Sequence, residues 1–379
     1  MRPLADKEAN VQRIKVGIIG CGVIAPTHIE SYRKLADVEV AWVCDIVEEK
    51  ARKLAEKYGI PRVSADYRDV LADPEVSAVS VCTDHASHAP ITAAALEAGK
   101  HVLCEKALAA SSEGLDLMFA AHRRHPELVF AGVFQHRFEP ISQYVKAMIE
   151  KGCFGKLLTA GVQVWCLRTN EYYKADAWRG TWAQEGGAVL INQAIHFIDL
   201  LVWLAGGVAQ ISGTYENLTH QGVIETEDTA TAAVRFKCGA IGTIEATCSS
   251  PIGWQSRLHF RGTEGSLDIR DGRPDFVKFV REDVQKEVEA GLRTAVDAPG
   301  ELLGKSYYGS GHPAQIADFV SAIAEKRQPF IPASSARHAV DVVLSLYRSW
   351  RIGEWVTVPS GEVHGRRMRK VSPKKSASA

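Results

Sequence analysis

A strand that leads directly into a glycine turn is the feature that most constrains the fold of this chain. Residues Gly17–Ala25 read GIIGCGVIA, and a helical stretch follows at once. Gly20 permits the tight turn, Gly22 lets backbone amides approach a pyrophosphate, and small Ala25 lets the helix pack on the strand. The positive end of the helix dipole then faces the phosphates. The dinucleotide contacts predicted in this segment are Gly20, Gly22, Val23, Ile24 and Ala25.

The first third of the chain alternates short β-rich runs with helical stretches. The runs are IKVGIIG, VEVAWVCD, VSAVSVCT, KHVLCE and LVFAGV. This alternation predicts a parallel sheet with crossover helices, and the runs are apolar throughout, as strands buried on both faces must be. We therefore expect a Rossmann dinucleotide-binding domain over residues 14–134.

The second strand of this unit ends at Asp45, about twenty residues after the glycines, where a carboxylate can accept hydrogen bonds from the adenosine ribose hydroxyls. The same carboxylate would repel a 2′-phosphate, and no arginine follows immediately. NAD is therefore favoured over NADP. The alternative is a fold that keeps the glycine turn but binds no nucleotide.

The regular alternation of single strands and helices ends after Phe134. A helix is expected over about 141–151, then the strand LLTAGVQVWC and a long apolar helix over 187–204. The strands ATAAVRF, AIGTIEATC, RLHFRGT and GSLDIR follow with short glycine-containing turns, which is typical of an antiparallel sheet. Two more helices are expected near 313–326 and 334–350. The fold class is thus α/β plus α+β, with a mainly antiparallel open sheet flanked by helices over residues 135–360.

Composition excludes several classes of protein. The 379 residues suffice for two domains, and 45 basic residues balance 45 acidic ones, so no nucleic-acid partner is implied. The polar opening stretch, residues 1–13, lacks the apolar core of a signal peptide, and no run of about 18 apolar residues could span a membrane. A cytoplasmic protein is expected, with a flexible N-terminus over 1–13 and a disordered basic tail over 361–379.

The cysteines show no Cys-x-x-Cys pair, so they are expected to be reduced core residues, and no metal site is predicted. They are Cys21, Cys44, Cys82, Cys104, Cys153, Cys166, Cys238 and Cys248.

Two polar segments follow apolar strands at the edge where parallel sheets bind ligands. Thr83 ends one strand, and the pair Glu105-Lys106 ends the next. A lysine at this edge would sit beside a nicotinamide, although an ion pair on the surface would explain it equally well.

A third group of polar residues interrupts the long apolar helix. Asn192, His196 and Asp199 are four and three residues apart, so on a helix they share one face. The simpler interpretation is a core histidine whose hydrogen-bond partner is Asp199.

Together these motifs resemble the glucose-fructose oxidoreductase, inositol dehydrogenase and rhizopine catabolism family (Gfo/Idh/MocA), from about residue 15 to about 358. The matching segments are Gly-x-Ile-Gly-x-Gly, Thr-x-x-x-x-His, Ala-Gly-Lys-His-Val-x-x-Glu-Lys, and Gly-Gly followed by His-x-x-Asp. The resemblance implies that Lys106 lies beside the nicotinamide and substrate and that His196 is the acid/base. It also implies cofactor contacts at Thr83, His88, Glu105 and Gln135, a substrate-pocket position for Arg137, and a homodimer or homotetramer formed through the C-terminal sheet.

Two positions depart from the family pattern. The motif proline is replaced by Ala107, so the bond after Lys106 is expected to lose the cis option of an X-Pro link. Asn192 stands where polyol dehydrogenases of the family often carry Asp, and asparagine can both donate and accept a hydrogen bond.

The expected reaction is hydride transfer between a secondary alcohol of a sugar or polyol and the nicotinamide. His196 would take the hydroxyl proton, Lys106 would stabilise alkoxide charge, and Asn192 would fix another hydroxyl or the histidine. The loop from Trp165 to Gly180 is rich in aromatic rings and guanidinium groups, which suit sugar faces and anionic groups or simply brace the sheet. Its predicted substrate contacts are Arg168, Trp178 and Arg179. NAD-assisted glycoside cleavage and a non-catalytic, NAD-binding regulatory role are the alternatives.

Overall fold

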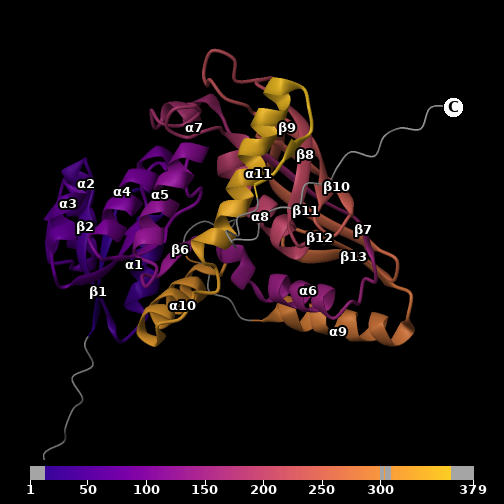
Figure 1. Cartoon of the computed structure of the whole chain (residues 1–379), viewed down its shortest axis with the longest axis horizontal. Coiled ribbons are helices and arrows are strands. Elements are labelled where there is room, and N and C mark those ends of the chain that lie inside the picture. The colour runs from indigo at the N-terminus through magenta and orange to yellow at the C-terminus, as the bar shows by residue number, and fades with distance from the viewer. Residues whose placement is uncertain (1–12, 299–302, 304–308, 360–379) are drawn as a thin grey trace, which may run out of the picture.

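Two β-sheets organise the chain (Figure 1). The structure is a computed structural model that describes residues 13–298, 303 and 309–359. Apart from residue 13, the predicted flexible N-terminus and basic tail lie outside these residues. No helix of the described part of the chain is both long and apolar enough to cross a membrane.

The first sheet has the order β3-β2-β1-β4-β5-β6, and its neighbouring strands pair in parallel. This confirms the predicted Rossmann arrangement. Strand β3 was not predicted, because a run of three residues carries no readable pattern. The strands are β1 (Ile14–Ile19), β2 (Val38–Cys44), β3 (Arg62–Ser64), β4 (Val76–Val81), β5 (His101–Cys104) and β6 (Phe130–Gly132).

Helices cover both faces of this sheet. Adjacent residues of β4 belong to different hydrophobic clusters: Val79 packs in the cluster that contains Leu115, and Ala78 in the one that contains Ile29. Side-chain caps fix the start of three of these helices, since Asp66 accepts from the Arg68 amide, Asp84 from the Ser87 amide and Ser111 from the Gly114 amide. The helices are α1 (Ala25–Arg33), α2 (Glu48–Tyr58), α3 (Tyr67–Ala72), α4 (His85–Glu97) and α5 (Ser112–Arg124).

A late helix completes the Rossmann core. Helix α10 (His312–Glu325) packs against α1, and its Phe319 is buried in the same cluster as Ile29. Gln315 accepts from the Phe134 amide at 3.1 Å and donates to the Gly132 carbonyl at 2.8 Å. The C-terminal part of the chain therefore holds the end of β6 in place.

The second sheet has the order β13-β12-β11-β7-β10-β9-β8-β14. Its described neighbours pair antiparallel except β7 and β10, which run parallel, so the predicted mainly antiparallel sheet is confirmed. Strands β8, β13 and β14 were not predicted. The strands are β7 (Leu157–Leu167), β8 (Val208–Glu216), β9 (Thr229–Phe236), β10 (Ile241–Thr247), β11 (Ser249–Gly262), β12 (Gly265–Arg270), β13 (Arg273–Phe279) and β14 (Val356–Thr357).

One face of the second sheet is covered by helices, and the other face is more accessible. In β7, Val162 and Val164 are fully buried, whereas Gln163 and Trp165 between and beside them are partly exposed. Helix α9 was not foreseen. The remaining helical segments are η1 (Gln135–Phe138), α6 (Pro140–Glu150), α7 (Asn170–Lys174), η2 (Val189–Ala194), α8 (Ile195–Leu204), α9 (Glu282–Asp297) and α11 (Ala333–Ile352).

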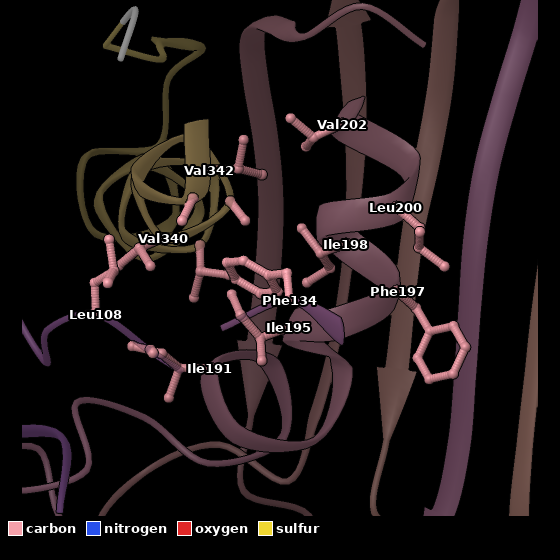
Figure 2. Close-up of a cluster of buried hydrophobic side chains, with 14 of the residues drawn as sticks. Leu108, Phe134, Ile191, Ile195, Phe197, Ile198, Leu200, Val202, Val340 and Val342 are labelled. Atoms are coloured by element: carbon pink, nitrogen blue, oxygen red, sulfur yellow. The ribbon is translucent and has the colours of Figure 1, made fainter. Parts of the chain in front are cut away.

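The long apolar helix expected over 187–204 is divided into a π-helical turn, η2, and the α-helix α8. At its start the amides of Ala188 and Leu190 donate to the carboxylate of buried Glu227 at 3.0–3.1 Å. Figure 2 shows Phe134, Ile191 and Ile195 gathered between this helical segment and α11, whereas Phe197 points to the opposite side. The segment is thus fixed by apolar packing and by a buried cap.

Arg137 is a structural residue, which corrects its predicted place at the substrate pocket. Its side chain is about 3 % exposed, and its Nε donates to Asp199 Oδ2 at 2.7 Å. Its Nη1 donates to Ser335 Oγ at 2.8 Å, and Trp203 lies beneath the guanidinium. Asp199 therefore pairs with Arg137 on η1, not with His196, because the guanidinium offers the buried carboxylate two donors.

The buried Arg137–Asp199 pair should matter for stability. We expect Asp199→Ala to lower the free energy of unfolding by about 3 kcal/mol or more, because it leaves a buried guanidinium unpaired. Urea unfolding measures this. Asp275→Ala, which removes an exposed ion pair with Arg270, should cost under about 1 kcal/mol. Equal costs for the two variants would contradict the assignment.

Candidate active site

A cavity of about 680 Å³ lies where the carboxyl edge of the parallel sheet faces the second domain. Its lining includes most of the predicted site residues: Gly20, Gly22, Val23, Ile24, Asp45, Thr83, Glu105, Lys106, Gln135, Arg168, Trp178, Arg179, Asn192 and His196. Three predicted contacts, Ala25, His88 and Arg137, lie outside the lining formed by the described residues. The two domains therefore bring together residues that are far apart in sequence.

The glycine turn has the shape that a pyrophosphate needs. Gly20 has φ +96°, and a Cβ there would lie 2.5 Å from the Cys82 carbonyl, so only glycine fits. A Cβ on Gly22 would meet no described atom within 4 Å, which leaves its backbone open to a ligand. Ala25 is fully buried at the start of α1, so it serves packing rather than contact.

Asp45 lies at the end of β2, where its carboxylate faces the cavity. It accepts from the Cys21 amide at 2.8 Å and from the Val47 amide at 2.8 Å, one on each oxygen. Each carboxylate oxygen can accept more than one hydrogen bond, so capacity remains for ribose hydroxyls. The residues present therefore fit the adenosine half of NAD.

Glu105 is held by a histidine that the sequence analysis missed. The Nε2 of buried His28 lies 2.9 Å from Glu105 Oε1, and its Nδ1 lies 3.1 Å from Ser80 Oγ. Burial alone would raise the pKa of Glu105, but the hydrogen bond and charge of His28 hold that pKa at about 2. The amide of Lys106 donates to the other carboxylate oxygen at 3.1 Å. Glu105 is therefore an anion that fixes the start of the lysine loop.

His88 lies behind the site, which corrects its prediction as a cofactor contact. It is fully buried, with Nδ1 2.7 Å from the Ala107 carbonyl and Nε2 3.1 Å from the Thr83 carbonyl. Its ring thus joins two segments that line or adjoin the cavity. The peptide bond Lys106–Ala107, directly before one of these contacts, is cis, so the expectation that alanine would abolish the cis form is wrong.

Lys106 reaches across the domain junction. Its Nζ donates to Asn192 Oδ1 at 2.7 Å and to the Asn192 carbonyl at 3.1 Å. Burial lowers the pKa of Lys106, and Glu105 and Glu185 oppose that effect. The alternative of an ion pair on the surface is therefore wrong. The side-chain oxygen of Asn192 is thus engaged with Lys106 and not with His196.

His196, one of the polar residues that interrupt the apolar helical segment, lines the cavity. Its Nδ1 is buried and has no hydrogen-bond partner among the described residues. Its ring packs edge-on against Phe134 and His136, with centroids 5.9 and 5.2 Å away. Burial, together with the neighbouring charges of His136 and Lys106, holds the pKa of His196 well below 6.5. The ring is therefore neutral near pH 7 and is able to accept a proton, and the interpretation as a core histidine bonded to Asp199 is wrong.

Aromatic and basic side chains form the wall opposite the sheet edge. Arg179 lies 4.2 Å over the Tyr172 ring, and Arg168 lies 5.5 Å over the Trp254 ring. Arg168 Nη2 also donates to Gln193 Oε1 at 2.6 Å. Gln193 and Trp254 were missed, because Trp254 is on a distant strand and neither belongs to a motif.

The loop from Trp165 to Gly180 contributes unevenly to this wall. Trp165 is on the accessible face of the second sheet, where its indole N–H donates to Glu245 at 2.8 Å. Trp178 lines the cavity and packs against His85, with ring centroids 5.5 Å apart. Arg168 and the later part of the loop therefore line the cavity, whereas Trp165 at its start lies elsewhere.

Comparison with known proteins agrees with this geometry. Residues 14–133 match the family described as "Oxidoreductase family, NAD-binding Rossmann fold", and residues 142–268 match the "GFO/IDH/MocA C-terminal domain". The chain is 30% identical to an inositol 2-dehydrogenase of Salmonella paratyphi B, over 68% of this chain and 74% of that protein. It is 26% identical to levoglucosan dehydrogenase of Pseudarthrobacter phenanthrenivorans, over 83% and 90%.

Among solved structures, the WlbA dehydrogenase of Bordetella pertussis in complex with NADH and UDP-GlcNAcA superimposes with a TM-score of 0.82. The two chains are 28% identical, and the match covers 94% of this chain and 99% of that one. The resemblance predicted from the motifs is thus confirmed, and the chain belongs to the Gfo/Idh/MocA family of NAD-binding oxidoreductases.

Proposed function

We propose that this protein is an NAD-dependent oxidoreductase that transfers a hydride between a secondary alcohol or ketone of a sugar, polyol or sugar derivative and the nicotinamide. The observation that carries the proposal is the pair Lys106 and His196, which lie in the same cavity as the glycine turn and Asp45. The relatives support it: their names describe dehydrogenases of inositol and levoglucosan, and the WlbA dehydrogenase is in complex with NADH and UDP-GlcNAcA.

The residues assigned to NAD divide along the cavity. Gly20, Gly22 and Asp45 would hold the pyrophosphate and adenosine, and Thr83, Glu105 and Gln135 would lie toward the nicotinamide. Bound NAD supplies the acceptor for the hydride that leaves the alcohol carbon. The protein's own part is to orient the alcohol, to move its proton and to exclude water.

His196 and Lys106 divide the acid–base work in this proposal. Neutral His196 accepts the hydroxyl proton, and the Lys106 ammonium donates a hydrogen bond to the same oxygen and stabilises its developing negative charge. Asn192 holds the ammonium in place. Ketone reduction reverses these steps, with His196 donating the proton.

The substrate is proposed to lie against Arg168, Trp178 and Arg179. Aromatic faces suit the apolar faces of sugar rings, and guanidinium groups suit a carboxylate or phosphate. The assignment of these three side chains as substrate contacts rests on their place in the cavity wall.

Pairing of two chains through the accessible face of the second sheet is also proposed. That face is a broad surface, and Ile241 at its β10 strand is 59% exposed. Light scattering should give a dimer or tetramer, and a monomer mass would contradict the pairing.

Because the cysteines of the described residues are free, we propose a reducing, cytoplasmic location, which cell fractionation tests. Cys238 is exposed, so the prediction that every cysteine is a core residue is wrong.

Turnover tests the proposal directly. Purified protein with NAD should produce NADH absorbance with at least one member of a panel of polyols, aldoses, sugar acids, glycosides and nucleotide sugars. We expect Lys106→Ala and His196→Ala each to lower the rate at least about 100-fold. His125→Ala, which removes a histidine at the end of α5, is the control and should not change it. Full activity of His196→Ala would sink the acid–base assignment.

The pH profile gives a second test. His196 accepts a proton only in its neutral form, so kcat/KM for oxidation should decline as the pH falls through the pKa of His196. Because burial lowers that pKa, the midpoint of the acid limb should lie below 6.5. A midpoint above that value, or an unchanged limb in His196→Ala, would argue against His196 as the base.

Cofactor choice gives a third test. Asp45→Ala should weaken NADH binding by about 30-fold, because hydrogen bonds to ribose hydroxyls are lost. It should leave NADPH binding equal or tighter, because a negative charge beside the 2′-phosphate is removed. Fluorescence titration measures both constants, with exposed Asp37→Ala as the control. A parallel loss for both nucleotides would contradict the role of Asp45.

A further inference from the structure

A buried acid next to the site has no part in the mechanism described so far. Glu185 is 1% exposed and lies directly before Gly186 and Gly187. Each of its two carboxylate oxygens accepts a hydrogen bond from a specific donor. Oε2 accepts from the Gly180 amide, and Oε1 accepts from Asn192 Nδ2.

The backbone around Glu185 is fixed from both domains. Its carbonyl lies 2.8 Å from His85 Nδ1 at the start of α4. A Cβ on Gly186 would lie 2.4 Å from the Ala110 carbonyl, and one on Gly187 would lie 2.1 Å from the Tyr347 hydroxyl. Both glycines have positive φ, so this close approach is open only to glycine. The carboxylate is therefore presented from a segment with little freedom to move.

This position determines which way the Asn192 amide faces. A carboxylate only accepts hydrogen bonds, and a lysine ammonium only donates them. The amide N–H of Asn192 must therefore point to Glu185, and its Oδ1 to Lys106, as the 2.7 Å contact has it. Reversing the amide would set donor against donor at Lys106 and acceptor against acceptor at Glu185.

Nearby charged residues also influence the pKa values of Lys106 and Glu185. Lys106 faces Glu105 and Glu185, which raise its pKa against the effects of burial, Arg168 and Arg179. Burial, together with Glu227, raises the pKa of Glu185 to about 7, while the amide of Gly180, Asn192 and Lys106 oppose the rise. The carboxylate is thus predominantly ionised above about pH 7.

We infer that Glu185 is a positioning residue for Lys106: it orients the Asn192 amide and, through that amide, holds the lysine ammonium at the reacting end of the cavity. The meaning of this placement for catalysis rests on the proposed function, but the placement itself can be tested without substrate or cofactor.

The test is the pKa of Lys106 in the free protein. Competitive labelling with acetic anhydride over a range of pH, read by mass spectrometry of the peptide that contains Lys106, measures it. In Glu185→Gln the side chain has one acceptor where Gly180 and Asn192 need two. The Asn192 amide should then turn its oxygen away from Lys106. We expect the pKa of Lys106 to fall by about one unit, which is about a tenfold faster labelling at a fixed pH below that pKa.

The same substitution in a variant that lacks Asn192 separates the effect of amide orientation from the effect of the Glu185 charge. In Asn192→Ala, the additional change Glu185→Gln should lower the pKa of Lys106 clearly less than it does in the otherwise wild-type protein, because only the direct charge effect of Glu185 remains to be lost. An equal fall in both backgrounds, or no fall in the otherwise wild-type protein, would overturn the proposal. Asp268→Asn is the matched control, since Asp268 is also buried but pairs with Arg257 and Arg261 on the second sheet. It should leave the pKa of Lys106 unchanged.

If Glu185→Gln does not fold, a second variant provides the test. Glu185→Asp keeps the charge but ends one methylene short of Asn192, so the pKa of Lys106 should fall in the same direction by a smaller amount. An unchanged pKa in a folded Asp variant would also overturn the proposal. Because these measurements need no turnover, they remain informative even if the proposed dehydrogenase activity is absent.

Discussion

The hydrogen bond from Lys106 Nζ to Asn192 Oδ1 is the contact on which the rest of the site depends. It joins the edge of the parallel sheet to the helical segment of the second domain across 86 positions of sequence. A buried ammonium is costly without acceptors, so the bond requires both domains to present their parts at fixed positions. Glu105 fixes the lysine side of this contact, and Glu185 fixes the amide side.

Each side is supported by structure that lies outside the cavity. On the first domain, His28 and His88 hold Glu105 and the loop after Lys106. On the second, Glu227 receives the amides at the start of η2, and the Arg137–Asp199 pair anchors α8 to η1. Among the described residues these groups lie outside the lining of the candidate active site, yet they determine where His196 and Asn192 lie. Charged residues are therefore retained in the interior for position rather than for contact with a ligand.

Much of this arrangement could be predicted from the sequence, because its signals are local. The glycine turn, Asp45, the pair Glu105-Lys106 and the helix that carries His196 each follow from short patterns whose chemistry requires particular residue types. The parallel sheet follows from uninterrupted apolar runs. What failed was pairing over long distances: nothing local shows that Arg137 meets Asp199, that His28 meets Glu105, or that Trp254 reaches the cavity. The cis bond at Ala107 and the π-turn η2 also depend on surroundings that a linear pattern does not contain.

The most direct test of the account is a crystal structure of the protein with NADH. The account predicts that the adenosine ribose lies within hydrogen-bond distance of Asp45 and that the nicotinamide ring lies against the pocket formed by Lys106 and His196. It also predicts that the Lys106–Asn192 contact persists. A nicotinamide directed out of the cavity, or separated from both Lys106 and His196 by protein, would contradict the central claim that these two residues serve hydride transfer.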